Sequence, residues 1–152
     1  MKIDDYTKAW LAGFIDGEGY IGIVRQRKKP GKYNSATWQY HPWIIITGTD
    51  KDIIDDLCIV LDAKRASLSP TAGHKIGYQA KITNFASLRK LIEWITPFLR
   101  IKNQQAILLL KFIDYRENSI IVTGRKSYGN SSFGIDEENI YLELRKLNKR
   151  GV

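Results

Sequence analysis

The chain has 152 residues, of which 43% are hydrophobic and 26% are charged, and its formal net charge is +8. This composition predicts one globular domain, and it excludes a disordered chain, a disulfide-rich scaffold (Cys58 stands alone) and a membrane span of about 18 apolar residues. The first ten residues lack the apolar run of a signal peptide, so we expect an intracellular protein. The excess of basic residues favours a polyanionic partner, nucleic acid before an anionic membrane, although basic charge without any binding role is an equal alternative.

The first half of the chain is expected to form a helix, a hairpin and a second helix. Trp10, Leu11 and Phe14 recur at helical spacing, and the glycines that follow end the helix. Two runs of alternating residues then flank a Pro-Gly turn, which is typical of a hairpin. The expected elements are a helix over 6–16, strands over 20–28 and 37–47, and a helix over 50–62 that is capped by Thr49 and directs Ile53, Leu57, Val60 and Leu61 inward.

The second half is expected to repeat the pattern and then to add helices. The expected elements are a hairpin over 64–83, helices over 85–95 (capped by Asn84), 103–117 and 136–150, and a polar connection over 119–134. Two hairpins from similar halves can form one sheet, so we expect an α+β fold with the order αββαββα and helices on one face of a four-stranded antiparallel sheet.

The other face of that sheet would be left open, with polar, basic and aromatic residues that suit a DNA groove. An open face that is merely solvated is the alternative, and it holds for most antiparallel sheets. From the alternation we assign to the open face Gln26, Lys28, Gln39, His41, Arg65, Ser67 and Tyr78, and to the core side Ile21, Ile23, Trp38, Tyr40, Ile44 and Ile46.

A stripe of small residues follows the first helix, since Ala9, Gly13 and Gly17 fall four residues apart. Glycine in mid-helix costs about 1 kcal/mol relative to alanine. A chain that keeps Gly13 is therefore expected to use the missing side chain for a close contact. Spacing alone leaves two partners open, another helix of the same chain or the same helix of a second copy, which would place a two-fold axis between the helices.

Two acids, Asp16 and Glu18, lie at the end of this stripe. Glu18 is expected just past the helix C-terminus, where free carbonyl groups are already negative, so a carboxylate there needs a cation. Hard oxygen ligands suit Mg²⁺ (or Mn²⁺), and no Cys/His cluster competes. For Asp16 we prefer local capping of backbone amides. Two Glu18 carboxylates that met at a two-fold axis would need a bridging metal, and such a site beside a basic surface describes a nuclease.

The segment LAGFIDGEG (11–19) resembles the LAGLIDADG signature of homing endonucleases, with Glu in place of the later Asp. PFLRIKNQQAILLLKFID (97–114) resembles the end of the core in members with one motif per chain, so the resemblance covers about 5–117. It implies a single endonuclease domain over 1–152 with a saddle-shaped sheet, acting as an intron-encoded homodimer. Such an enzyme would cut long, nearly palindromic double-stranded DNA with divalent metal and leave four-base 3′ overhangs. The extension over 118–152 lies outside the resemblance and is expected to add DNA contacts or dimer packing.

The resemblance also implies roles for individual residues. Glu18 would bind the metal together with the Gly17 carbonyl, and Lys102 would stabilise the transition state or order water. Members often place Gln or Asn at the end of the second strand, where this chain reads ITGTDKD. Thr47, Gly48 and Thr49 are the candidates for that position, and we assign the role to Thr47, with Lys51 as a basic residue nearby. We expect Ala9, Trp10, Ala12, Gly13, Asp16 and Gly17 at the dimer interface. We expect DNA contacts from Tyr20, Val24, Arg25, Gln26, Lys28, Lys29, Lys32, Tyr33, Asn34, Gln39, His41, Arg65, Ser67, Ser69, His74, Lys75, Tyr78 and Lys81.

A non-catalytic protein on the same scaffold is the alternative function. It would be either a splicing maturase that binds RNA or a DNA-binding regulator. Such relatives often lose the acid that binds the metal, whereas Glu18 and Lys102 are both present in this chain. Their presence favours retained cleavage.

Overall fold

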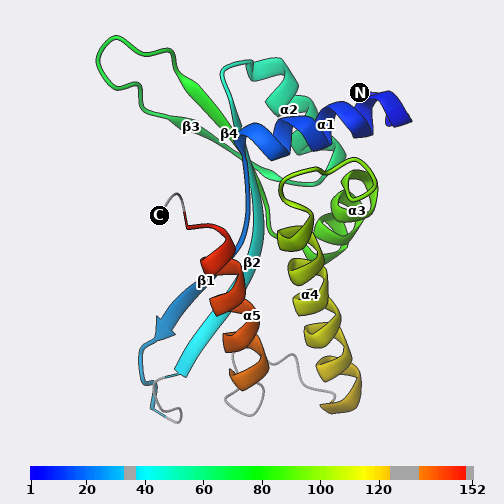
Figure 1. Cartoon of the computed structure of the whole chain (residues 1–152). Coiled ribbons are helices and arrows are strands. Elements are labelled where there is room, and N and C mark those ends of the chain that lie inside the picture. The colour runs from blue at the N-terminus through cyan, green and yellow to red at the C-terminus, as the bar shows by residue number, and fades with distance from the viewer. Residues whose placement is uncertain (33–36, 124–133, 150–152) are drawn as a thin grey trace. The chain divides into compact units, whose positions relative to one another are not determined.

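The computed structural model of the chain describes residues 1–32, 37–123 and 134–149 (Figure 1). Its four strands form one sheet in the order β1-β2-β4-β3, which confirms the expected α+β fold. By its internal contacts the chain divides into two compact units, Met1–Ile21 with Trp43–Ala106 and Gly22–Pro42 with Ile107–Val152. The elements are α1 (Asp5–Glu18), β1 (Gly19–Lys28), β2 (Thr37–Gly48), α2 (Lys51–Val60), β3 (Lys64–Leu68), β4 (Gly77–Ile82), α3 (Phe85–Ile95), α4 (Asn103–Thr123) and α5 (Gly134–Leu147).

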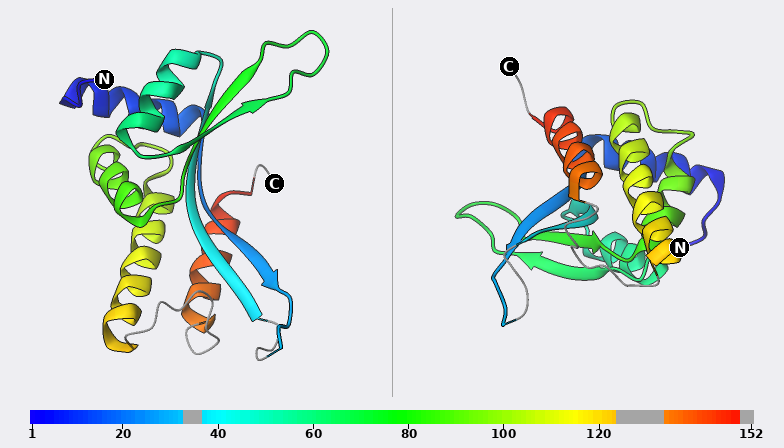
Figure 2. Two further views of the ribbon diagram at one scale, coloured as in Figure 1. Left: turned by 180° about the vertical axis from the view of Figure 1, so that it is seen from behind. Right: turned by 90° about the horizontal axis from the view of Figure 1, so that it is seen from below.

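In the first unit, α1 packs on α3, and α2 packs on β4 and β3. Their apolar sides and the inner face of the sheet form one core, and the β3–β4 hairpin extends away from the three helices (Figure 2). Burial of these aliphatic side chains supplies the main driving force for folding this unit. Its fully buried side chains include Leu11, Ile15, Ile44, Ile46, Ile54, Leu57, Leu88 and Leu91.

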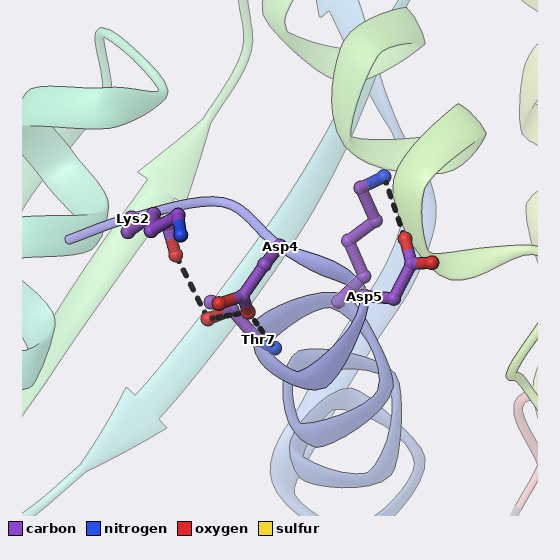
Figure 3. A network of polar contacts seen from close by, with 5 residues as sticks. Lys2, Asp4, Asp5 and Thr7 are labelled. Carbon is purple, nitrogen blue, oxygen red and sulfur yellow. Dashed lines mark hydrogen bonds and ion pairs between the residues drawn. The ribbon is translucent and has the colours of Figure 1, made fainter.

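Helix α1 begins with a side-chain cap, which Figure 3 shows from close by. Asp4 accepts a hydrogen bond from the Thr7 amide at 2.9 Å, which satisfies one of the free donors of the first turn. The same hydrogen bond holds the pKa of the Asp4 carboxyl below its ordinary value. Lys8 pairs with Asp5 across one turn at 3.1 Å. The helix then continues to Glu18, two residues beyond the expected end, and β1 follows at once.

Helix α2 begins one residue later than expected and ends at Val60, two residues earlier than expected. Its N-cap is Asp50, which accepts from the Ile53 amide at 3.1 Å, so the assignment of Thr49 is wrong. The inward side also differs, since Ile54 is buried in place of Ile53, which is half-buried, as is Val60. The Asn84 cap of α3 is confirmed by its 3.2 Å bond from the Ser87 amide.

Cross-strand pairing in the first unit fixes which residues share a face of the sheet. Ile46 of β2 pairs with Ala80 of β4, and both are fully buried on the helix-covered face. Arg65 of β3 pairs with the same Ala80, and directly paired residues point to the same face. Ser67 and Tyr78 pair with each other two residues further along, so they share that face too.

The expected open face is therefore wrong for Arg65, Ser67 and Tyr78. Along β3 the apolar Ala66 and Leu68 alternate with Arg65 and Ser67, which points Arg65 and Ser67 outward. All five residues are exposed, however, and a shift of one residue in register reverses every assignment. The position of the Arg65 guanidinium agrees with the register, since its Nε lies 3.0 Å from Asp55 Oδ1 in α2. The opposite face of this unit carries Ile45, Thr47, Lys64, Ala66, Gln79 and Lys81.

In the second unit, α5 packs on the ribbon formed by β1 and β2. The buried Tyr40 hydroxyl donates to Glu138 of α5, and its carbonyl accepts from Arg116 of α4 at 3.3 Å. Burial and the neighbouring carboxylate raise the pKa of Tyr40. Arg25 joins the same carboxylate at 2.6 Å. The extension after residue 117 thus contributes to the core of this unit, a role that the sequence analysis did not foresee.

Two further expectations in the second unit meet a different structure. Trp38 is 43% exposed rather than buried, with its ring under the Arg25 and Arg27 guanidinium groups at 4.3 and 5.9 Å. Helix α4 reaches Thr123, so 119–123 is helical, because no Gly or Pro interrupts the chain before Gly124. The remainder of the expected connection lies outside the described residues.

Arg116 and Glu137 form the most buried ion pair of the described residues, and replacing one partner is expected to destabilise the protein. Nε and Oε1 lie 2.6 Å apart, with 8% and 4% of the side chains exposed. Burial raises the pKa of the Glu137 carboxyl, and the guanidinium opposes that shift. Arg116→Met would leave a buried carboxylate without its counter-charge, at a cost of about 3–5 kcal/mol in the free energy of unfolding.

Urea unfolding measures that cost, with Lys8→Met as a control because its pair is exposed. The double replacement Arg116→Met with Glu137→Leu is expected to recover most of the loss, because neither charge is then left buried alone. A single variant as stable as the parent protein would contradict the assignment.

Across the described residues, no helix combines the length and apolar character that crossing a bilayer demands.

Candidate active site at the end of helix α1

The turn from α1 into β1 has no room for a side chain at Gly19. A Cβ atom placed there would lie 2.8 Å from both the Cα and the carbonyl oxygen of Ile15. The Gly19 amide also donates to that carbonyl and closes the helix. Glu18 is consequently the last residue of the helix, not the first beyond it, and its side chain is exposed.

Asp16 binds the segment that joins α3 to α4. Its Oδ2 lies 2.7 Å from the Arg100 amide, its Oδ1 lies 2.9 Å from the Lys102 amide, and both oxygens lie 3.2 Å from the Ile101 amide. The Asp16 carboxylate does accept backbone amides, but they belong to a segment more than eighty residues away, so the expectation of a local cap in its own turn is wrong. Three donors converging on one carboxylate form an anion-binding nest.

Lys102 in turn contacts the end of α1 with its side chain. Nζ donates to the carbonyl oxygens of Ile15 and Asp16, each at 2.7 Å. The last turn of α1 contains no basic residue of its own, so the ammonium group provides the positive charge that the negative helix end favours. The sequence argument demanded a cation beside Glu18, and this lysine is one. The charge of the helix end alone therefore no longer requires a metal.

The donors at this helix end still suit a hard divalent ion. The Glu18 carboxylate and the Gly17 carbonyl are oxygen ligands of the kind that Mg²⁺ prefers. Within the described part of the chain, no group of three or more His, Cys, Asp or Glu residues gathers to hold a metal. The described part of one chain thus offers two oxygen ligands at this helix end.

The small-residue stripe of α1 faces outward. Ala9, Gly13 and Gly17 are exposed, and a Cβ atom at either glycine would have no described heavy atom within 4 Å. The alternative of a close helix crossing inside the chain is therefore wrong as far as the described residues extend. Trp10 borders the stripe, half exposed and stacked on Phe14 with 5.4 Å between ring centroids.

Two of the expected interface residues do not belong to this outer surface. Ala12 is 0% exposed, because it points into the chain's own core. Asp16 is half-buried, and its carboxylate is occupied by the amides of 100–102. The outward surface of the stripe thus consists of Ala9, Trp10, Gly13 and Gly17.

Thr47 and Lys51 lie in the same unit as the helix end, and among the described residues no hydrogen bond or ion pair joins either to Glu18. Thr47 is half-buried near the end of β2 and pairs directly with Gln79 of β4. Lys51 lies in the first turn of α2, where Nζ contacts Asp55 Oδ2 at 2.5 Å. The sequence analysis missed Gln79 and Lys64 on the open face. Counting outward from the buried Ala80 and Ile82 along β4 could have found Gln79.

The residues expected to contact DNA differ in their exposure to solvent and in the contacts that they already make. Arg25 is held by Glu138, and Lys81 Nζ lies 4.2 Å from the centre of the Trp43 ring. Tyr33 and Asn34 lie outside the described residues. The exposed members are Tyr20, Gln26, Lys28, Lys29, Lys32, Arg65, Ser67, Ser69, His74 and Lys75, and the half-buried ones are Val24, Arg25, Gln39, His41, Tyr78 and Lys81.

Comparison with known proteins adds a family and a fold. The family model described as LAGLIDADG endonuclease matches residues 11–116. The homing endonuclease I-CvuI, solved in complex with the I-CreI target, is 20% identical, with 99% of this chain and 89% of that chain covered and a TM-score of 0.71. The archaeal intron-encoded I-Vdi141I, solved with DNA, is 16% identical over 97% and 87% of the two chains, with a TM-score of 0.73.

A third solved structure, the homing endonuclease I-TnaI, is 18% identical over 97% of each chain, with a TM-score of 0.64. At these identities the likeness shows a shared fold. No curated protein matches the chain.

Proposed function

This chain belongs to the LAGLIDADG endonuclease family, and from that membership we propose that it is a site-specific homing endonuclease encoded within an intron. It acts as a homodimer, binds a long, nearly palindromic site in double-stranded DNA, and hydrolyses both strands with a divalent metal such as Mg²⁺ or Mn²⁺. The products carry four-base 3′ overhangs.

The observation that carries the proposal is that Glu18 and the Lys102 ammonium group lie at the same end of α1. The acid is the last residue of α1, and the ammonium group is hydrogen-bonded to the carbonyls one turn before it. A metal-binding carboxylate beside a fixed positive charge suits the hydrolysis of a phosphodiester, in which negative charge grows on the leaving oxygen. A relative that had lost cleavage would not need to keep both groups.

The metal would be held by the Glu18 carboxylate and the Gly17 carbonyl, with a second copy completing its shell. When bound, it would activate a water molecule and stabilise the departing 3′ oxygen. The outward stripe of α1 supports the pairing of two copies, because Gly13 and Gly17 leave room for another backbone to approach.

The direct test is to incubate the purified protein with the intron-less form of its host gene, with and without Mg²⁺. We expect a double-strand cut that depends on the metal and leaves four-base 3′ overhangs. Specific binding without a cut at any metal concentration would support the DNA-binding regulator instead. Binding of intron RNA without DNA cleavage would support the maturase.

The residues that the β3–β4 register places on the open face of the sheet lead to a specific prediction about DNA binding. Lys64 and Lys81 pair directly on the face opposite the helices, where two like charges repel each other unless an anion lies between them. Lys64→Ala and Lys81→Ala are each expected to weaken binding to all sequences and to lower the salt dependence of the affinity by about one unit of slope. Arg65→Ala is the matched control, because its guanidinium pairs with Asp55 on the other face.

Fluorescence anisotropy with labelled DNA at several salt concentrations measures these slopes. Equal losses for Arg65 and for the two lysines would mean that the register does not determine which face meets the DNA. A slope unchanged in both lysine variants would remove this face from the DNA interface.

A further inference from the structure

We infer that Asp16 is a positioning residue for cleavage, which acts by fixing Lys102 at the end of α1 where Glu18 lies. The inference rests on the proposed endonuclease function and deepens it. It differs from the sequence-based assignments, which placed Asp16 at the dimer interface and in a local cap.

The number and origin of its hydrogen bonds set Asp16 apart from an ordinary cap. The caps at Asp4, Asp50 and Asn84 each accept one amide from three residues ahead. Asp16 accepts the amides of Arg100, Ile101 and Lys102, which follow one another in a distant segment. Such a set does not extend α1, whose own closing bond is made by Gly19. It holds the 100–102 backbone against the helix end.

Lys102 is fixed through every part of its backbone and through its side chain. Its amide donates to the Asp16 carboxylate, its carbonyl accepts from the Ala106 amide at 3.1 Å as α4 begins, and Nζ reaches the carbonyls of Ile15 and Asp16. The contacts between Asp16 and Lys102 therefore form a closed ring. A lysine side chain is long and loses substantial rotamer entropy when it is confined. Confinement of its backbone by Asp16 reduces the number of positions that the ammonium group can occupy.

The geometry also explains why a carboxylate is needed at this position. Two carboxylate oxygens accept three amides, whereas the amide side chain of Asn offers one oxygen and turns a donor toward the same nest. Asp16→Asn is thus close in volume but reverses part of the hydrogen bonding. The 100–102 segment would be released, and the lysine with it, while the exposed Glu18 would stay in place at the helix end.

The test is a double-mutant cycle on single-turnover cleavage, with Asp16→Asn, Lys102→Gln and the double variant. Because small misplacements of a catalytic group cost about 10²-fold in rate, Asp16→Asn is expected to lose about that factor. Affinity for uncut DNA, measured with Ca²⁺ in place of Mg²⁺, is expected to change little. In the Lys102→Gln background Asp16→Asn is expected to have almost no further effect, since its partner is already absent.

Asn84→Ala serves as the matched control, because it removes the cap of α3, which packs on α1. It is expected to lower the melting temperature and to have the same small effect on rate in both backgrounds. Losses from Asp16→Asn and Lys102→Gln that multiply would overturn the inference, because a merely structural cap would behave in that way. Hydrogen exchange of the Arg100, Ile101 and Lys102 amides is expected to accelerate in Asp16→Asn and to stay slow in Lys102→Gln.

If Asp16→Asn does not fold, Asp16→Glu replaces it, since that variant keeps the charge and displaces the carboxylate by one methylene group. Its loss of rate is expected to disappear in the Lys102→Gln background, and cleavage as fast as that of the parent protein would overturn the inference. An unsubstituted protein that cuts no DNA overturns the proposed function and the inference together. Cleavage that needs Glu18 but shows multiplicative losses overturns the inference alone.

Discussion

Glu18→Gln is expected to abolish metal-dependent DNA cleavage while leaving DNA affinity largely unchanged. The substitution keeps the size of an exposed side chain at the last position of α1, so the fold and the DNA surface have no reason to change. It removes the negative charge that would hold the metal. A metal bound at the reacting phosphate contributes several kcal/mol to the transition state, so the rate is expected to fall by at least about 10³-fold.

Two controls make this result specific. Glu18→Asp keeps a carboxylate, and it restores the acid of the signature that the segment 11–19 resembles, so measurable metal-dependent cutting is expected to remain. Cleavage is measured under single turnover, and affinity is measured separately on uncut DNA. Glu18→Gln cutting at the parent rate would exclude a metal role for this acid. A parallel loss of binding would instead assign Glu18 to the recognition of DNA.

Gly13→Leu is expected to separate a dimer into folded monomers. A Cβ atom at Gly13 meets no described heavy atom of the chain within 4 Å, so the new side chain fits the monomer and clashes with a second helix laid against the stripe. The monomer is expected to gain slightly in stability, because glycine in mid-helix costs about 1 kcal/mol. Sedimentation velocity is expected to show half the parent mass, and cleavage is expected to fail, because the proposed site needs both copies.

Gly19→Ala serves as the comparison, because it is expected to lower the stability of the folded chain itself rather than to separate a dimer. A Cβ atom there would lie 2.8 Å from the Ile15 backbone, so this smaller substitution is expected to destabilise each chain without regard to any partner. Circular dichroism during thermal unfolding distinguishes the two variants. A Gly13→Leu protein that still sediments as a dimer would mean that the stripe does not form the interface.

Much of the element order could be predicted from the sequence, because helical spacing, Pro-Gly turns and capping residues are local signals. The LAGFIDGEG segment likewise identifies one helix end from sequence alone. The phase of β3 could not be predicted from its own alternation, because its apolar residues Ala66 and Leu68 lie on the open face and only the pairing with β4 fixes which side the helices cover. The Asn84 cap was predictable, whereas the Thr49 cap failed by one residue, the usual uncertainty of a helix boundary.

The partners of Asp16 could not be predicted either, because hydrogen bonds between segments far apart in the sequence follow from the tertiary fold. Asp16 and Lys102 were each singled out by position in a motif, and nothing in their spacing showed that one holds the other. Helix α5 illustrates the same limit. Ile140 and Leu144 show that one side of it is apolar, but the sequence does not identify the ribbon of β1 and β2 as the surface that this side covers.

The packing of α5 sets a minimum length for any trimmed version of this protein. The family match ends at residue 116, yet Tyr40, Arg25 and Arg116 are all satisfied by carboxylates of α5. A gene shortened to the matched segment would remove the carboxylate partners of Arg25 and Arg116 and uncover the Tyr40 ring on the ribbon. Anyone seeking a compact scaffold for genome engineering from this chain must therefore carry its final helix along, even though the family signature ends before that helix.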